Sequence, residues 1–165
     1  ILLSLTLLLA LTSLQLVAQH EEASKNTEVG IGKTFPAIDL VGLDGKRVTH
    51  LDLKHQPVVV FYFDPFCDHC QQEAQWINEN PDLWKGITLL WVSWGEMEDI
   101  KAFPGKYLPN GPEDMIFTKD DKYKFDDYFG YSNIPTVYVY NNKGLRTASF
   151  DKETKPEILV KFARQ

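Results

Sequence analysis

The chain has 165 residues, a net charge of −6 at pH 7 and 44% hydrophobic residues. This length is typical of one domain, and the apolar content excludes an intrinsically disordered chain and a disulfide-stapled miniprotein. The acidic balance argues against nucleic acid as a partner, because phosphate contacts need clustered Lys and Arg. The two cysteines, Cys67 and Cys70, are three residues apart.

The first 20 residues differ in composition from the rest. They contain no Asp, Glu, Lys or Arg, and 13 of the first 18 are apolar. This composition is typical of a secretory signal peptide, with cleavage after Ala18. A helix of this length spans about 27 Å, so an uncleaved membrane anchor is an alternative; a buried core helix fits less well. We therefore expect a signal peptide or anchor over 1–18, a polar linker over 19–30 and one folded domain over 31–165.

In the first half of this domain, the sequence predicts strands and one helix. Extended segments at 35–40 and 47–49 flank an Asp-Gly turn and indicate a hairpin. The continuous β-branched and aromatic run 58–63 and the apolar run 87–93 are typical of strands buried on both faces. Between them, apolar residues spaced among Gln and Glu predict a helix over 68–79 that ends before a proline.

The second half predicts shorter elements: helices at 96–103 and 122–129, a strand at 115–118, a hairpin at 136–150 and a last helix at 156–163. Pro104-Gly105 is expected to end the first of these helices, followed by a surface loop up to Pro112. In the last helix, Ile158, Leu159 and Phe162 share one apolar face. The expected fold class is therefore α/β, with one sheet flanked by helices.

The chemistry is predicted at the end of the first buried strand, where Cys67-Asp68-His69-Cys70 opens a helix. Positions i and i+3 share a helix face, which allows a disulfide. So small a ring removes little conformational entropy from the unfolded chain, and the pair is better suited to reversible exchange than to stapling. The positive end of the helix dipole favours a thiolate at Cys67, the expected nucleophile, with Cys70 as the resolving cysteine.

Other roles for the cysteine pair fit less well. Two free structural cysteines are one alternative. Cys67, Cys70 and His69 are potential metal ligands, but structural zinc needs four ligands and the sequence offers no second pair of Cys or His residues. No resident metal is therefore expected. A peroxidatic cysteine is disfavoured because the Thr that peroxiredoxins carry three residues earlier is Asp64 here.

The strand–Cys-x-x-Cys–helix unit, Ile134-Pro135-Thr136 before a hairpin and the last helix together resemble the thioredoxin fold over 31–165. The leader, the N-terminal hairpin and Cys70-Gln-Gln-Glu73 are similar to the extracytoplasmic TlpA/ResA-like thiol–disulfide oxidoreductases. The resemblance implies a three-layer sandwich, with a central mixed sheet and an N-terminal β-hairpin extension. It also implies that Glu73 helps to move protons at the buried cysteine, and that a cis Pro135 leaves the Ile134 backbone free to pair with substrate.

Several residues depart from the family pattern. Phe66 stands where a Trp usually precedes the first cysteine and is expected to shield the sulfur and contact substrate. Phe61 replaces a buried acid, which leaves Glu73 or water as the acid/base group. His69 and Asp68 are expected to tune the thiolate in opposite directions, because a protonated His stabilises it and a carboxylate destabilises it.

Two further patterns surround the cysteines. Eight acidic residues and one lysine lie between Asp64 and Asp99, which indicates either a solvated acidic face or a role in partner choice. Trp76 and Trp91 are expected in the core, and Trp94, after a strand end, is the candidate for the edge of the active site.

The sequence thus predicts an exported thiol–disulfide oxidoreductase that reduces protein disulfides and needs no cofactor. Its expected partners are a protein thiol or disulfide substrate and a second redox protein that restores the dithiol. Its expected location is the bacterial periplasm, either free or membrane-anchored. A disulfide oxidase or isomerase, a copper or zinc metallochaperone and a binding module that needs no cysteines are the alternatives.

Overall fold

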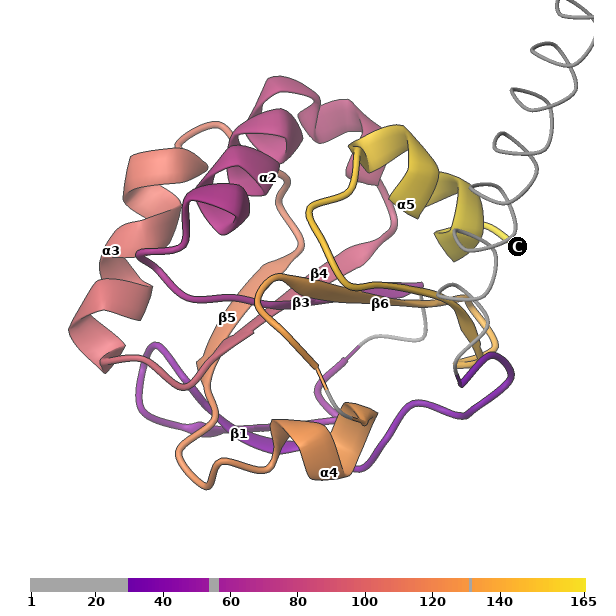
Figure 1. Ribbon diagram of the computed structural model, residues 1–165, viewed down its shortest axis with the longest axis horizontal. Helices are drawn as coiled ribbons and strands as arrows, with labels where there is room; N and C mark the ends of the chain where they lie inside the picture. The colour runs from indigo at the N-terminus through magenta and orange to yellow at the C-terminus, as the bar shows by residue number, and fades with distance from the viewer. Residues whose placement is uncertain (1–29, 54–56, 131) are drawn as a thin grey trace, which may run out of the picture.

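The computed structural model describes residues 30–53, 57–130 and 132–165 (Figure 1). The expected leader over 1–18, and the expected linker apart from Gly30, lie outside these residues. Within the described ranges, no helix is long and apolar enough to cross a membrane.

A mixed seven-stranded sheet forms the centre of the domain, in the order β2-β1-β5-β4-β3-β6-β7. Its strands are β1 (Asp39–Gly42), β2 (Arg47–Thr49), β3 (Val58–Tyr62), β4 (Thr88–Ser93), β5 (Met115–Lys119), β6 (Thr136–Tyr140) and β7 (Arg146–Phe150). The three inner strands β3, β4 and β5 are parallel, and all other pairings are antiparallel. Tyr62 at the end of β3 pairs with Thr136 at the start of β6, so the segments after β3 and before β6 meet at the same end of these two strands.

Helices cover both faces of the sheet. In Figure 1, α2 (Asp68–Glu79), α3 (Met97–Tyr107) and α5 (Pro156–Ala163) lie on one face, and α4 (Phe125–Phe129) lies on the other. A short 3₁₀ helix, η1 (Pro81–Trp84), follows α2. The predicted three-layer α/β architecture with an N-terminal β1–β2 hairpin is confirmed.

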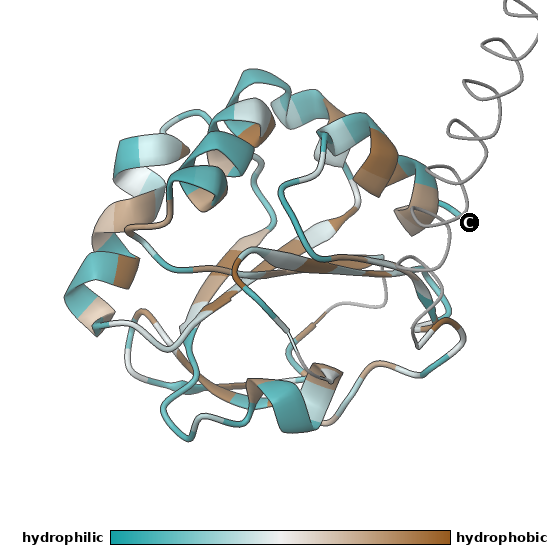
Figure 2. Cartoon of the chain, in the orientation of Figure 1, coloured by the Kyte–Doolittle hydropathy of each residue, from teal (hydrophilic) through white to brown (hydrophobic). Residues whose placement is uncertain are grey.

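Two apolar clusters, one on each face of the sheet, form the core. Val59 and Phe61 of β3 contribute to the cluster under α2, α3 and α5, whereas Val58 and Val60 contribute to the cluster on the α4 side. The prediction that β3 is buried on both faces is therefore confirmed. Trp91 stacks on Phe61 with ring centroids 4.3 Å apart, as expected for a core tryptophan. Figure 2 shows hydrophobic residues concentrated in the central strands, with mostly hydrophilic residues in the loops.

The prediction that Pro104-Gly105 ends a helix is wrong, because α3 continues to Tyr107. Proline lacks the N–H that would bond to the carbonyl of Ile100, but its own carbonyl accepts the N–H of Leu108 at 2.9 Å. The turn that follows buries Leu108 and packs Tyr107 against Phe103, with ring centroids 4.9 Å apart. These apolar contacts offset the lost hydrogen bond.

Smaller differences concern exposure and element length. The α4 helix begins at Phe125, so the segment 122–124 that the sequence assigned to it is a turn. Ile158 is 43% exposed, and the buried face of α5 consists instead of Pro156, Leu159, Val160 and Ala163. Trp76 is only half-buried, because it lies on the outer side of α2 under the Lys155 ammonium, 3.4 Å from its ring centroid.

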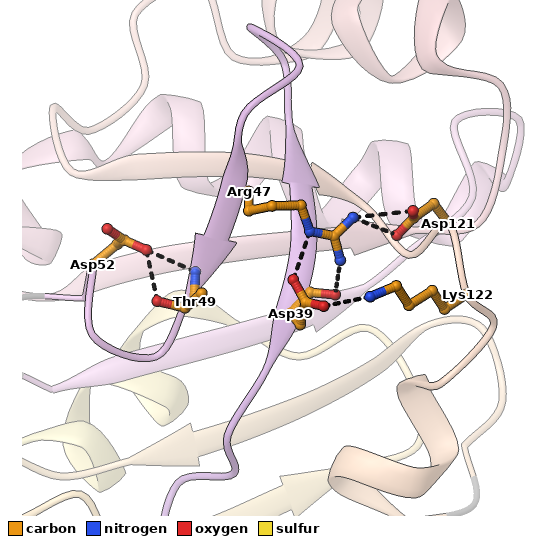
Figure 3. A network of polar contacts seen from close by, with 6 residues as sticks. All are labelled: Asp39, Arg47, Thr49, Asp52, Asp121 and Lys122. Atoms are coloured by element: carbon orange, nitrogen blue, oxygen red, sulfur yellow. Dashed lines mark hydrogen bonds and ion pairs between the residues drawn. The ribbon is translucent and has the colours of Figure 1, made fainter.

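A charged network fixes the N-terminal hairpin to the rest of the sheet (Figure 3). The Arg47 guanidinium of β2 donates to the Asp39 carboxylate of β1 at 2.5 Å and to both oxygens of Asp121 at 3.0 Å. Lys122 pairs with the other oxygen of Asp39. The network joins the hairpin to the segment that follows β5, so it ties the edge of the sheet to the connection that leads into α4.

Candidate active site

Cys67 occupies the N-cap position of α2, just after the loop that follows β3. The loop is held by Asp64, whose carboxylate accepts the Phe66 N–H at 2.7 Å and whose carbonyl accepts the Cys67 N–H at 3.1 Å. The Cys67 sulfur accepts the backbone N–H of Cys70 at 3.2 Å. An N–H directed at sulfur at a helix N-terminus stabilises negative charge there, and Cys67 is partly exposed.

Cys70 lies one turn inside α2 and is fully buried. Both cysteines are free thiols in the structure. Burial, and next its contact with Cys67, raise the pKa of the Cys70 thiol well above its usual range. The two sulfurs therefore differ in exposure: Cys67 is partly exposed, whereas Cys70 is fully buried.

Glu73 lies on the next turn of the same buried helix face and is 1% exposed. Burial raises its carboxyl pKa to about 8; the Thr154 N–H, which donates to Oε1 at 2.9 Å, opposes the shift, and the nearby Glu153 adds to it. The carboxylate also acts electrostatically on the Cys70 thiol. A carboxyl group that titrates near neutral pH beside a buried thiol is suited to accept and release a proton.

The two residues between the cysteines lie on the surface. Asp68 is exposed in the first turn of α2. The His69 side chain is 69% exposed, and its Nδ1 lies 3.2 Å from the Glu153 carboxylate. Glu153 comes from the segment between β7 and α5, so this contact joins that segment to the N-terminus of α2.

The predicted substrate-contact residues surround the cysteines from two segments. Phe66 is 73% exposed directly before Cys67. The Ile134–Pro135 peptide bond is cis and directly precedes β6, the neighbour of β3. Ile134 and Cys67 both pack against the same core cluster. Trp94 directly follows β4, the other neighbour of β3, so it lies at the same end of the strands; it is 42% exposed.

Sequence reasoning did not identify the segment that covers Glu73. Thr154 and Glu153 are about 80 residues away in the chain, and they reach α2 because they lie in the short segment that joins β7 to α5. No local pattern in the sequence marks them. Among the described residues, His, Cys, Asp and Glu side chains form no group of three that could hold a metal ion.

Solved structures show the same fold. A secreted disulfide oxidoreductase of Mycobacterium tuberculosis aligns with a TM-score of 0.63 at 17% identity, covering 77% of this chain and 94% of that one. A thiol:disulfide interchange protein DsbE of Chlorobium tepidum aligns with a TM-score of 0.65 at 22% identity, covering 80% and 94%. The chain therefore has a thioredoxin-like fold, with a Cys-x-x-Cys pair at the start of α2.

The chain belongs to the AhpC/TSA family, whose model matches residues 31–145. It is 23% identical over 141 residues to the thiol-disulfide oxidoreductase ResA of Geobacillus thermodenitrificans, covering 84% of this chain and 79% of that protein. It is 26% identical over 144 residues to the chloroplastic peroxiredoxin Q of Suaeda salsa, covering 82% and 66%. The predicted family resemblance is confirmed.

Proposed function

We propose that this protein reduces disulfide bonds of client proteins outside the cytoplasm. The observation that carries the proposal is the asymmetry of the cysteine pair: Cys67 is partly exposed at the N-cap of α2, and Cys70 is fully buried one turn behind it. A nucleophile open to a partner and a protected resolving thiol are what stepwise exchange requires.

The reaction has two steps. The Cys67 thiolate attacks one sulfur of the client disulfide, which forms a mixed disulfide and releases the first client thiolate. Cys70 then loses its proton to Glu73 or water and attacks the Cys67 sulfur, which forms the Cys67–Cys70 disulfide and releases the second client thiolate. Two electrons pass from the protein dithiol to the client, and a second redox protein must return them.

Phe66, Ile134 and Pro135 are proposed to contact the client around Cys67. The backbone of the Ile134 segment is suited to pair with an extended chain, as in other cases of strand addition. His69 and Asp68 are proposed to adjust the stability of the Cys67 thiolate from the surface of α2. The location is supported by the composition of residues 1–18 and by the secreted neighbour of Mycobacterium tuberculosis.

Two cysteine variants test the mechanism. We expect Cys67→Ala to abolish reduction of a protein disulfide such as that of insulin. Cys70→Ala keeps the nucleophile but lacks the resolving thiol, so it is expected to accumulate mixed disulfides, visible as adducts on non-reducing gels. Full activity of Cys67→Ala would show that the mechanism is wrong.

The reduction potential decides the direction of electron flow. We expect a value nearer that of thioredoxin, about −270 mV, than that of DsbA, about −120 mV, in equilibration with glutathione buffers. A potential near the upper value would instead indicate a disulfide oxidase or isomerase. Because peroxiredoxin Q is a relative, peroxide consumption by the reduced protein is measured in parallel; turnover of peroxide faster than of protein disulfides would contradict the proposal.

A further inference from the structure

A groove of about 170 Å³ lies directly beside the active site. Its lining includes Phe66 and Gln71 on the α2 side and Asp99, Phe103, Lys106 and Tyr107 of α3 on the other. Pockets for whole small molecules are larger, about 300–1,000 Å³. The groove is therefore of a size for one side chain of a bound polypeptide, next to the residue that precedes the nucleophile.

The surface beside the groove is apolar and rigidly presented. Phe66 is 73% and Trp94 is 42% exposed. The loop under Phe66 is fixed, because the Gln71 amide donates to the Pro65 carbonyl at 2.9 Å. The turn after Trp94 packs on the same loop, since a Cβ at Gly95 would lie 3.5 Å from Pro65 Cδ. Exposed aromatic side chains on a fixed support next to a nucleophile mark an interaction surface.

The surroundings of the groove carry excess negative charge. In the described part of the chain, four acidic residues of the bounding segments have no ion-pair partner: Asp64, Asp68, Glu98 and Asp99. Lys101 and Lys106 of α3 offset two of these four charges, so the excess is about two; Lys106 lies in the wall of the groove with its ammonium over the Tyr107 ring, 4.9 Å from the centroid, and Lys119 pairs with Glu96 at 3.5 Å. A surface with uncompensated acids attracts a positively charged partner and raises its association rate.

We infer that the groove binds an apolar side chain of an extended, positively charged client segment, close to the client cysteine. The inference rests on the proposed exchange at Cys67, since the preceding residue Phe66 lines the groove, and it names the class of client that the site selects. The apolar walls supply contact area, and the acidic surroundings supply the preference for Lys and Arg.

Disulfide-linked peptide dimers test this selection. One peptide carries Phe next to its Cys and flanking Lys residues; a second replaces the Lys residues by Glu, and a third replaces the Phe by Ser. We expect the Glu peptide to be reduced with a kcat/KM about tenfold lower at low salt, with the difference shrinking at high salt. The Ser peptide is expected to lose about fivefold, independently of salt. Equal kcat/KM values for the three peptides would overturn the inference.

Variants locate the effect in the groove. We expect the double variant Asp68→Asn, Asp99→Asn to lower the ratio of kcat/KM between the Lys peptide and the Glu peptide. Phe66→Ser is expected to lower the ratio of kcat/KM between the Phe peptide and the Ser peptide. Glu79→Gln removes one exposed negative charge at the far end of α2 and is expected to change neither. If the groove variants kept the wild-type kcat/KM ratios, or if Glu79→Gln lowered these ratios as much as the groove variants do, the groove would not be the site that selects the client.

Two further measurements separate this inference from the proposed function. Bis(2-hydroxyethyl) disulfide is small and neutral, so its reduction reports exchange at Cys67 without use of the groove. If it is reduced and the peptides do not differ, the proposed function stands and the inference fails. The same peptides with Ser in place of Cys cannot undergo exchange, so their affinity, measured by tryptophan fluorescence, reports binding in the groove alone. Equal affinities of the Lys and Glu peptides would likewise overturn the inference.

Discussion

Cys70 and Glu73 lie on the buried face of α2, and burial governs the proton chemistry of both. The Cys70 thiol and the Glu73 carboxyl each have a raised pKa, because charge is poorly solvated at this position. Both groups therefore favour their neutral forms in the resting dithiol. Cys67, one turn away, is partly exposed, and we propose that it is the sulfur that a client reaches first.

Glu73 predicts a pH dependence of stability. Its pKa is about 8 in the folded protein and near 4.5 when exposed, so between these values the folded state holds a proton that the unfolded state has lost. The free energy of unfolding should therefore fall as pH rises from 4.5 to 8, by an amount on the order of 5 kcal/mol at most. Glu73→Gln should remove most of this slope, measured by urea denaturation at pH 5 and pH 8.

A matched change elsewhere on α2 serves as the control for Glu73. Glu79→Gln replaces an exposed carboxylate at the end of the same helix and should leave the slope as in the wild type. A Glu73→Gln protein whose stability falls with pH as steeply as the wild type would show that this carboxyl is not the group responsible.

At the scale of elements, α3 shows how packing extends a helix beyond a local stop signal. Pro104 stands eighth among the 11 residues of α3. The helix continues because Phe103, Tyr107 and Leu108 pack on the core cluster under α2, α3 and α5. The same packing holds α3 beside the N-terminal turn of α2, where both helices form the groove next to Cys67.

Removal of this proline should stabilise the protein. Pro104→Ala restores the backbone N–H that can bond to the Ile100 carbonyl. It also raises the conformational entropy of the unfolded chain, which lowers stability and offsets part of this gain. We expect a net gain of about 1–3 kcal/mol in the free energy of unfolding, measured by urea denaturation. Pro109→Ala, at an exposed position beyond the helix, should not stabilise the protein. Loss of stability in Pro104→Ala would mean that the proline itself is required for the packing of α3.

At the scale of the whole molecule, Arg146 joins three distant segments. It is 3% exposed, and its guanidinium donates to the Tyr140 hydroxyl at 2.7 and 3.0 Å and to the Phe129 carbonyl, at the end of α4, at 3.0 Å. Its backbone N–H donates to the Lys33 carbonyl. Gly30 lies so close that a Cβ there would be 2.6 Å from Nη1. One residue thus ties the N-terminal segment, the sheet and α4 together, through its backbone N–H and its guanidinium.

Arg146→Lys should therefore be strongly destabilising although it keeps the charge. Lys cannot donate in a planar fork to Tyr140 and Phe129 together, so buried acceptors are left unpaired. We expect a loss of about 2–4 kcal/mol in the free energy of unfolding, measured by urea denaturation. Arg164→Lys, at an exposed position near the C-terminus, should change it by less than about 0.5 kcal/mol. Equal effects of the two changes would contradict this role for Arg146.

The sequence by itself determined the features that depend on neighbours in the chain. The spacing of Cys67 and Cys70 at a strand-to-helix junction predicted the pair that we propose to be reactive, because i and i+3 share a helix face wherever the helix lies. The uninterrupted apolar run of β3 identified a strand buried on both faces for a similar local reason.

Only the tertiary structure decided features that depend on distant segments. Thr154 covers Glu73, Glu153 reaches His69, and α3 closes one side of the groove at Phe66. Burial, and the pKa of a buried group, depend on what the rest of the chain places around it, and no local period encodes that placement. The proposed reactive pair could therefore be predicted from the sequence, whereas the burial around it and the groove that we propose for the client required the fold.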